Sequence, residues 1–480
     1  MTNAIINKLK QFRTDLFSFF KYRSDSTMDL IDAIAGQPSK ESAVKISLSN
    51  LFRRSYSSIT DVVDNLFRRE ADINLKSDEM QKAHFKMTEF LIKQCPQPIK
   101  RSFELMAVDC SSTHRIYSKK LEDRGFVHSP TKVPGQIPIT VGHQYSIVVF
   151  LPERSDLLEP HWVVPLSTVR VKTEESGTVK GMQQIIDIAT SDHFKNKLCV
   201  SVSDSAYSNG KSLKNANNEN NLINIARLRN NRHFNLPIPL VEPEKPKNVG
   251  RPKIYGECWI LKTPGEPSEK IIEKRFTASG RILNVQIERW NDRLEKGSDE
   301  SAPFLFDAVR VTVLREDGTA LYKKPLWLMV TGVRRQELSL ADIADSYFRR
   351  FDIEHFFRFS KQKLLLGSFQ TPDVRHEENW WWICMFSYIM LYHARLLANE
   401  VRHPWEKKQK KPNSIKVLTP SQVQRDYERI IMGIGTPANP PKRRGNSPGR
   451  HKGSQVVGRK DCAIVKKAEL CPKNKEKSAA

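Results

Sequence analysis

The sequence predicts an α/β protein built on a mixed β-sheet, and a succession of short apolar segments carries that prediction. Residues 103–108, 145–151 and 162–171 are the first three expected strands. A helix over 181–189 and a fourth strand over 198–202 follow. Hydrophobic residues make up 39% of the 480 residues, so the chain can bury a sizeable core.

Further elements are expected on both sides of this core. Residues 221–228 are interpreted as a helix, and residues 380–397 as a buried core helix because His393 and Arg395 interrupt the apolar run. Residues 59–67 show the apolar periodicity of an amphipathic helix. The helical N-terminal segment to which they belong is either a DNA-binding bundle or a plain packing module.

Shifts in composition divide the chain into six expected segments. Prolines mark the boundaries near residues 96 and 237. After the second boundary, apolar and polar residues alternate as in strands. The segments are an N-terminal helical domain (1–95), the first part of the core (96–236), a β-rich insertion (237–322), the second part of the core (323–400), a C-terminal helical segment (401–436) and a basic disordered tail (437–480).

Charge and cysteine usage narrow the class of function. The formal net charge is +24 and the pI is about 9.7, so a polyanion is the expected partner, with nucleic acid ahead of an anionic membrane surface. Seven scattered cysteines without a Cys-x-x-Cys pair exclude a zinc ribbon and favour a reducing compartment. Signal-peptide and membrane-spanning patterns are absent, so we expect a cytoplasmic protein. Phosphate-binding Walker loops, nucleophile elbows and dinucleotide fingerprints are also absent.

Three acidic residues are the candidates for catalysis. Asp109 and Asp204 follow apolar strand candidates, although an aspartate in that place is more often a simple turn residue. The third is Glu354, which lies in a helix expected to begin near Ser339. Three carboxylates brought together suggest phosphoryl transfer assisted by two Mg²⁺ ions, since Mg²⁺ prefers oxygen ligands.

Glu354 is part of a wider pattern. Tyr347, Arg350, Glu354 and Lys361 fall within an arc of about 60° if they lie on one helix. A salt-bridged surface face explains this spacing as well as a functional site does. Asp352, the nearest rival to Glu354, lies on the far side of such a helix.

The spacing Tyr-(2)-Arg-(3)-Glu-(6)-Lys resembles the signature of a group of bacterial insertion-sequence transposases of the DDE class, which have a ribonuclease H-like core. The sequences around Asp109 and Asp204 are similar to that family as well, and the resemblance spans about residues 100–400. It implies that the strands of the two aspartates are neighbours, that the glutamate helix packs beside them, and that a β-rich insertion separates Asp204 from Glu354.

The resemblance also implies roles. Asp109, Asp204 and Glu354 would bind two Mg²⁺ or Mn²⁺ ions, and Tyr347, Arg350 and Lys361 would contact the phosphates of the transposon ends. Water would cleave the end of the element, and the freed 3′-hydroxyl would attack target DNA. A homodimer would hold the paired inverted repeats, and the protein would be associated with the nucleoid.

Several weaker candidates accompany this site. Arg251 and Lys253 lie in a proline-rich basic loop that could enter a DNA minor groove, although a solvated linker is the commoner structure. Trp259 and Trp290 could stack a flipped base, but core packing is the stronger expectation. Arg115 either approaches DNA or has a loop role. Two alternative functions stay open: a catalytically inactive DNA-binding protein, and a structure-specific nuclease on the same core.

Overall fold

A computed structural model gives the fold. It describes residues 2–37, 42–68, 77–129, 137–154, 159–213, 215–238, 254–277, 279–296, 303–398, 417–443, 453, 455 and 458–467. The helices are α1 (Thr2–Phe19), α2 (Ser24–Gly36), α3 (Ala43–Ile46), α4 (Ser57–Asn65), α5 (Ser77–Ile92), α6 (Gly177–Ala189), α7 (Gly210–Leu213), α8 (Leu340–Phe348), α9 (Phe351–Lys363), α10 (Val374–Ala394) and α11 (Pro420–Ile434), with short 3-10 helices η1 (Ala216–Asn218) and η2 (Arg335–Glu337).

The strands form one mixed sheet. They are β1 (Glu104–His114), β2 (Gly125–His128), β3 (Ile139–Phe150), β4 (Val164–Val171), β5 (Cys199–Ser203), β6 (Leu222–Leu228), β7 (His233–Asn235), β8 (Cys258–Ile260), β9 (Glu269–Phe276), β10 (Ile282–Glu295), β11 (Phe304–Arg315) and β12 (Leu326–Thr331). The order is β2-β3-β1-β5-β6-β12-β11-β10-β7-β8, with β4 paired to β3 and β9 paired to β10.

The core of the sheet has the strand order β4-β3-β1-β5-β6. Strands β1, β3 and β4 pair antiparallel, whereas β5 and β6 run parallel to β1 after the crossover helix α6. This mixed α/β arrangement is consistent with the expected ribonuclease H-like fold. The helix expected over residues 221–228 is wrong, because this segment forms β6, buried between β5 and β12.

Strand β1 is longer than the sequence indicated. The apolar run ends at Val108, but the strand continues to His114 and pairs with β3 as far as Gly142. Asp109 therefore lies inside the strand and not at its carboxyl end, which corrects the expectation. Successive side chains of a strand point to opposite faces. The Val108 side chain faces α6, because a Cβ added to Gly181 of that helix would lie 2.8 Å from Val108 Cγ2. The next residue, Asp109, therefore faces the opposite side of the sheet.

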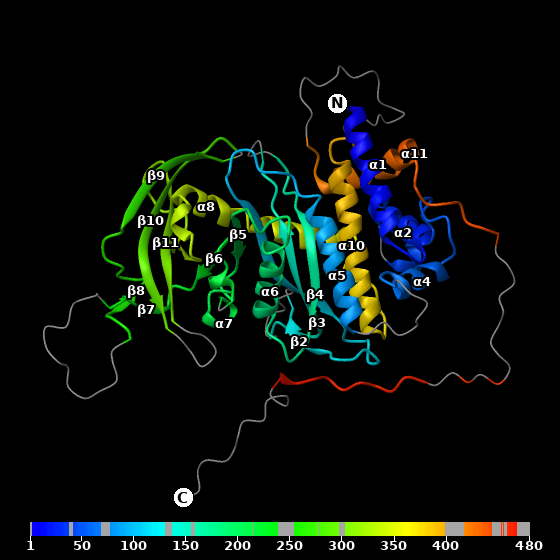
Figure 1. The fold of residues 1–480 in the computed structure, drawn as a ribbon, viewed down its shortest axis with the longest axis horizontal. Helices are drawn as coiled ribbons and strands as arrows, with labels where there is room; N and C mark the ends of the chain where they lie inside the picture. The colour runs from blue at the N-terminus through cyan, green and yellow to red at the C-terminus, as the bar shows by residue number, and fades with distance from the viewer. Residues whose placement is uncertain are drawn as a thin grey trace, which may run out of the picture.

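Helices cover both faces of the core sheet. Helix α6 packs against β1 and β3, α9 packs against β1, and α5 and α10 pack against β4. Figure 1 shows α5 and α10 between the sheet and the layer formed by α1, α2, α4 and α11. Helix α10 is apolar around most of its circumference and buried along nearly all its length, as residues 380–397 predict.

The insertion forms the other end of the molecule (Figure 1). Strands β10 and β11 make a long antiparallel ribbon that joins the core through β12 and β6, which agrees with the strand-like alternation of residues 237–322. None of the described helices is long and apolar enough to cross a lipid bilayer. In the basic tail, the backbone N–H groups of Cys462 and Val465 donate to the carbonyls of Lys119 and Arg124.

Candidate functional site

The parallel pairing of β1 with β5 brings the two aspartates together. Ala107 pairs with Val202, and Asp109 and Asp204 each follow two residues later. Paired strands lie about 4.8 Å apart, so the two aspartates stand side by side at the same level of the sheet. Asp109 accepts a hydrogen bond from the N–H of Cys110 at 2.7 Å, and Asp204 accepts one from the N–H of Ala206 at 2.9 Å. The expectation that the two strands are neighbours is confirmed.

The glutamate segment consists of two helices and not one. Helix α8 ends at Phe348 and α9 begins at Phe351, so Tyr347 belongs to α8 and Arg350 is the residue before α9. The prediction that the four residues share one continuous helical face is therefore wrong. The backbone N–H of Arg349 donates to the backbone carbonyl of Asp345, and this hydrogen bond ends α8.

The four residues still meet around Asp109. Arg350 Nη2 donates to Glu354 Oε1 at 2.6 Å, and Arg350 Nη1 lies 4.0 Å from Asp109 Oδ2. The guanidinium carbon lies 5.9 Å from the centre of the Tyr347 ring. Lys361 Nζ donates to the carbonyl oxygen of Ser112, further along β1, at 3.0 Å. The break between α8 and α9 thus does not separate the signature residues.

Electrostatics connects all three acids. Burial, and to a smaller extent the Asp204 and Glu354 carboxylates, raise the pKa of Asp109 to about 6, against the Cys110 N–H and Arg350, which lower it. Burial lowers the pKa of Lys361, while Asp109 opposes this change. The negative charge of the carboxylates near Asp109 therefore exceeds the positive charge that Arg350 provides. A divalent cation would relieve that repulsion.

The donor chemistry fits a hard divalent cation, because all three candidates are carboxylates. Their positions are a different matter. In the described part of the chain, no three His, Cys, Asp or Glu side chains form a group that could hold a metal ion. The Glu354 carboxylate is instead paired with Arg350, and its side chain is 45% exposed. The acids are gathered in one region without forming a ready-made coordination shell.

Asp352 has a separate, structural environment. Its side chain is 1% exposed, Oδ2 accepts from Arg349 at 2.7 Å, and Oδ1 contacts Arg154 and His161. Burial alone would raise the pKa of Asp352, but His161, Arg349 and Arg154 together lower it to about 2. This carboxylate is engaged away from Asp109, as the helical spacing predicted.

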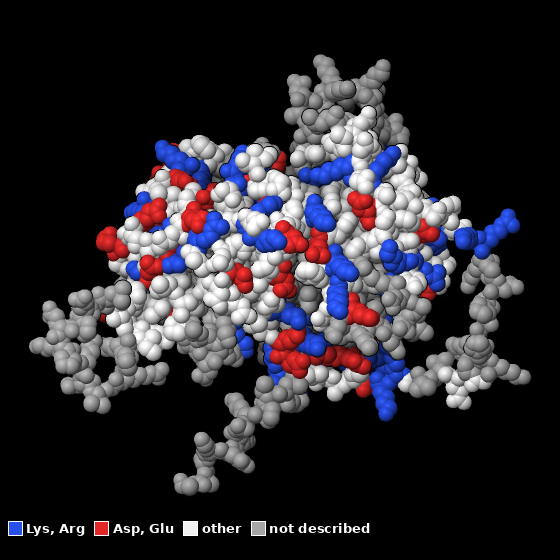
Figure 2. Space-filling view, viewed as in Figure 1, with Lys and Arg blue, Asp and Glu red and all other residues white. Residues whose placement is uncertain are grey.

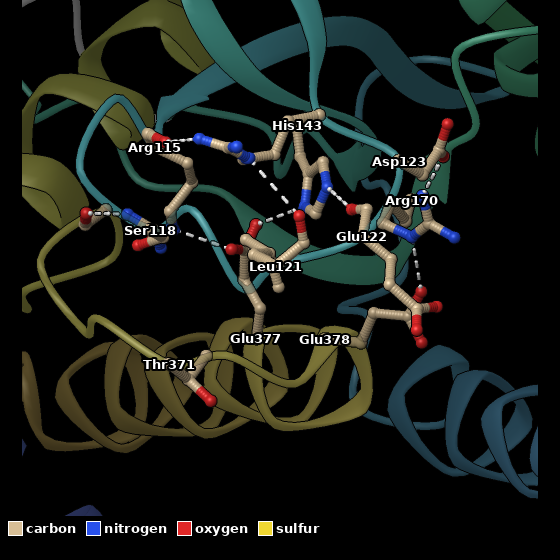
Figure 3. A network of polar contacts seen from close by, with 12 residues as sticks. Arg115, Ser118, Leu121, Glu122, Asp123, His143, Arg170, Thr371, Glu377 and Glu378 are labelled. Atoms are coloured by element: carbon tan, nitrogen blue, oxygen red, sulfur yellow. Dashed lines mark hydrogen bonds and ion pairs between the residues drawn. The ribbon is translucent and has the colours of Figure 1, made fainter. Parts of the chain in front are cut away.

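A buried ion network fixes the far end of β1. Arg115 Nε donates to Glu377 of α10 at 2.6 Å, and Arg115 Nη1 donates to the carbonyl of Gly367 at 2.9 Å. His143 of β3 joins the same carboxylate at 3.2 Å (Figure 3). Both side chains of the Arg115–Glu377 pair are fully buried, so the expected DNA or loop role of Arg115 is corrected. Glu377 lies in the polar first turn of α10, before the apolar run, so the sequence carried no signal for this network.

The remaining candidates divide into two groups. Trp259 and Trp290 are buried, with ring centres 6.2 Å apart, and both contact Trp327 of β12, so they pack the insertion as expected. Arg251 and Lys253 lie outside the described residues. Figure 2 shows basic and acidic side chains interspersed on the visible face, so the excess charge forms no continuous basic surface there.

Comparison with known proteins agrees with this geometry. Residues 77–296, from the start of α5 to just beyond β10, match the family model described as DDE superfamily endonuclease. The matched range contains Asp109 and Asp204 and ends before Glu354. No curated protein matches the chain. Residues 77–296, which carry both aspartates, are therefore similar to a DDE superfamily endonuclease domain.

Proposed function

We propose that the protein is a DNA transposase of a bacterial insertion sequence, which cleaves the ends of its element and joins them to target DNA. The observation that carries the proposal is the cluster around Asp109, where carboxylates from β1, from the residue after β5 and from α9 act on one another although they are distant in the sequence. The endonuclease domain supports a nuclease-type reaction on DNA. The additional step of strand transfer rests on the Tyr347, Arg350, Glu354 and Lys361 signature.

In this proposal Asp109, Asp204 and Glu354 hold two Mg²⁺ or Mn²⁺ ions. When bound, such ions activate an attacking oxygen and stabilise the leaving oxygen. The two aspartates are held by backbone N–H groups, which fixes their orientation. Glu354 is the adjustable member, because Arg350 holds its carboxylate in the absence of other partners.

The cationic residues of the site would bind DNA. Arg350 is only 9% exposed and lies between Asp109 and Glu354, so a DNA phosphate that binds it also approaches the acids. Lys361, anchored on the carbonyl of Ser112, would bind a neighbouring phosphate. Tyr347 is almost fully buried and would orient Arg350 through its ring face. Two chains would act as a homodimer on paired inverted repeats.

A strand-transfer assay with labelled element ends tests the proposal. The DNA that flanks the coding region, where the proposal places inverted repeats, supplies the substrate, and the full-length chain is incubated with Mg²⁺ and a target plasmid. We expect both cleaved ends and joined products. Cleavage without joining would support a structure-specific nuclease, and retention of DNA without cleavage would support an inactive DNA-binding protein.

The matched variants are Glu354→Gln and Glu316→Gln. The first removes the charge of the proposed third ligand, and we expect cleavage to be lost while DNA binding is largely kept. Glu316 lies in the exposed turn after β11, so its variant should cleave like the wild type. Undiminished cleavage by Glu354→Gln would remove this residue from the site.

A further inference from the structure

A groove lined by arginines lies beside the candidate site without including its three acids. Its larger cavity, of about 570 Å³, lies between the start of β1 and helix α8, and a smaller one of about 270 Å³ continues it. Both cavities share Lys100, Glu153 and Arg154. The cationic residues of this arginine groove are Lys100, Arg101, Arg154, Arg275, Arg349 and Arg395.

Consecutive residues connect the groove with the candidate site. Arg350 reaches Glu354 and Asp109, whereas its neighbour Arg349 donates to Asp352 and to the carbonyl of Pro152. The break between α8 and α9 places the two guanidinium groups in different surroundings. A strand of DNA held by Arg349 and its neighbours would thus be tied to the helix that carries Glu354.

The carboxylates of the larger cavity are already engaged. Glu153 accepts hydrogen bonds from the backbone N–H groups of residues 99, 100 and 101, and these bonds lower its pKa. Asp352 is shared by Arg154, Arg349 and His161. The Asp342 carboxylate accepts a hydrogen bond from the hydroxyl of Ser339, the N-cap of α8, and Asp345 pairs with Arg275. Glu153 Oε1 also lies 4.0 Å from Arg101 Nε, so the nearest carboxylate to Arg101 is one that three backbone N–H groups already engage.

Two guanidinium groups in the groove have incomplete hydrogen bonding. Arg101 Nη2 donates to the carbonyl of Leu151, but the buried Nε of Arg101 and that of Arg154 have no hydrogen-bond partner. Burial, and to a smaller extent Arg349, lower the pKa of Arg101 to about 10, against Glu153 and Glu104, which raise it. Buried donors without partners beside mutually repelling cations are stabilised by an oxyanion.

We propose that the arginine groove binds the phosphodiester backbone of DNA, outside the catalytic centre. Two adjoining cavities that share Arg154 suit successive phosphates of one strand better than a single free phosphate. Guanidinium groups match phosphate oxygens with paired N–H donors. The proposal rests on DNA as the substrate but needs no catalysis.

The salt dependence of DNA binding tests this proposal. Binding of the full-length chain to a fluorescent duplex without element sequences is measured by anisotropy at several salt concentrations without divalent ions. Each phosphate contact contributes about 0.9 to the slope of log K against log salt. For Arg101→Gln/Arg154→Gln we expect a slope smaller by about 1.8, so a fourfold rise in salt weakens binding about twelvefold less than in the wild type.

A charge-matched control separates local contacts from net charge. Lys195→Gln/Lys323→Gln removes the same charge from exposed sites outside the groove and should keep the wild-type slope. An equal decrease of the slope in both double variants, or none in the groove variant, would overturn the proposal. Thermal unfolding verifies the fold. If the groove variant unfolds, the exposed Lys100→Gln replaces it, with an expected decrease of about 0.9.

The assay also separates the groove from the proposed reaction. A groove variant with an unchanged slope, in a chain that still cleaves and joins DNA, would refute the groove alone. If the groove variant has a reduced slope but the wild-type protein neither cleaves nor joins DNA, the result would support the groove and refute the transposase proposal. If the groove substitutions reduce the salt slope for an oligoribonucleotide but not for duplex DNA, the assignment of the groove to DNA would be overturned.

Discussion

Replacing Asp109 by asparagine should make the metal-free protein more stable, although it should abolish cleavage. The Asp109 carboxyl is buried beside Asp204 and Glu354, and this surrounding disfavours its charged form. Asparagine has nearly the same shape and keeps an oxygen that can accept from the Cys110 N–H. The substitution therefore removes the charge and leaves the local hydrogen bond in place.

The magnitude follows from the pKa of this carboxyl. Its rise from 3.8 to about 6 corresponds to about 3 kcal/mol at 1.36 kcal/mol for each tenfold change in acidity. Between these two values the folded chain binds more protons at Asp109 than the unfolded chain does. The free energy of unfolding therefore falls as pH rises through this window. The penalty is complete above about pH 6 and absent below about pH 4.

Thermal and urea unfolding of wild type and Asp109→Asn should be compared at pH 8 and pH 4, with a chelator present. We expect the variant to be more stable by up to about 3 kcal/mol at pH 8 and equal to the wild type at pH 4. Glu316→Gln is the matched control and should change neither value. Mg²⁺ at a hundred times its Kd should stabilise the wild type by about 2.7 kcal/mol and the variant much less. A variant that gains nothing at pH 8, or gains equally at both pH values, would refute the reasoning.

Two further substitutions test the architecture around the site. Arg115→Met leaves Glu377 buried without its cation, and we expect a loss of about 3–5 kcal/mol in urea unfolding. The control Arg334→Met breaks the exposed pair with Glu337 and should leave the free energy of unfolding nearly unchanged. Gly142→Ala would place a Cβ 1.9 Å from the carbonyl oxygen of Thr113 in the β1–β3 ladder, so we expect a loss of at least about 1–3 kcal/mol, and unchanged stability would contradict the register of these strands.

The sequence predicted the core strands well where apolar runs were short and bounded by turns. It failed for residues 221–228, which form the buried strand β6. A strand covered on both faces shows no alternation between apolar and polar residues, so periodicity does not distinguish it from a helix. The end of β1 was missed for another reason. Beyond Val108 the strand contains Ser, Thr and His residues, whose extended conformation depends on pairing with β3.

The candidate site was predictable in part. The local signature predicted Glu354, and the ends of two apolar runs predicted Asp109 and Asp204. The parallel pairing of β1 and β5 confirms that the strands of the two aspartates are neighbours. The break between α8 and α9 was not predictable, because no proline or glycine marks it. The partnership of Arg115 with Glu377 joins residues 262 positions apart, a distance over which spacing carries no information.

The position of α10 limits how the protein can be dissected. One side of this helix rests on β4, and its other side is covered by α1, α2, α4 and α11. Deleting the first 95 residues would uncover the aromatic side chains of Trp382 and Phe386, which contact Phe67 and Phe20. Such a truncated chain should aggregate, since α10 would lose its apolar partners while still holding Glu377. The amino-terminal helices are thus inseparable from the sheet and α10, and shortened versions of this chain are unsuitable for measuring its chemistry.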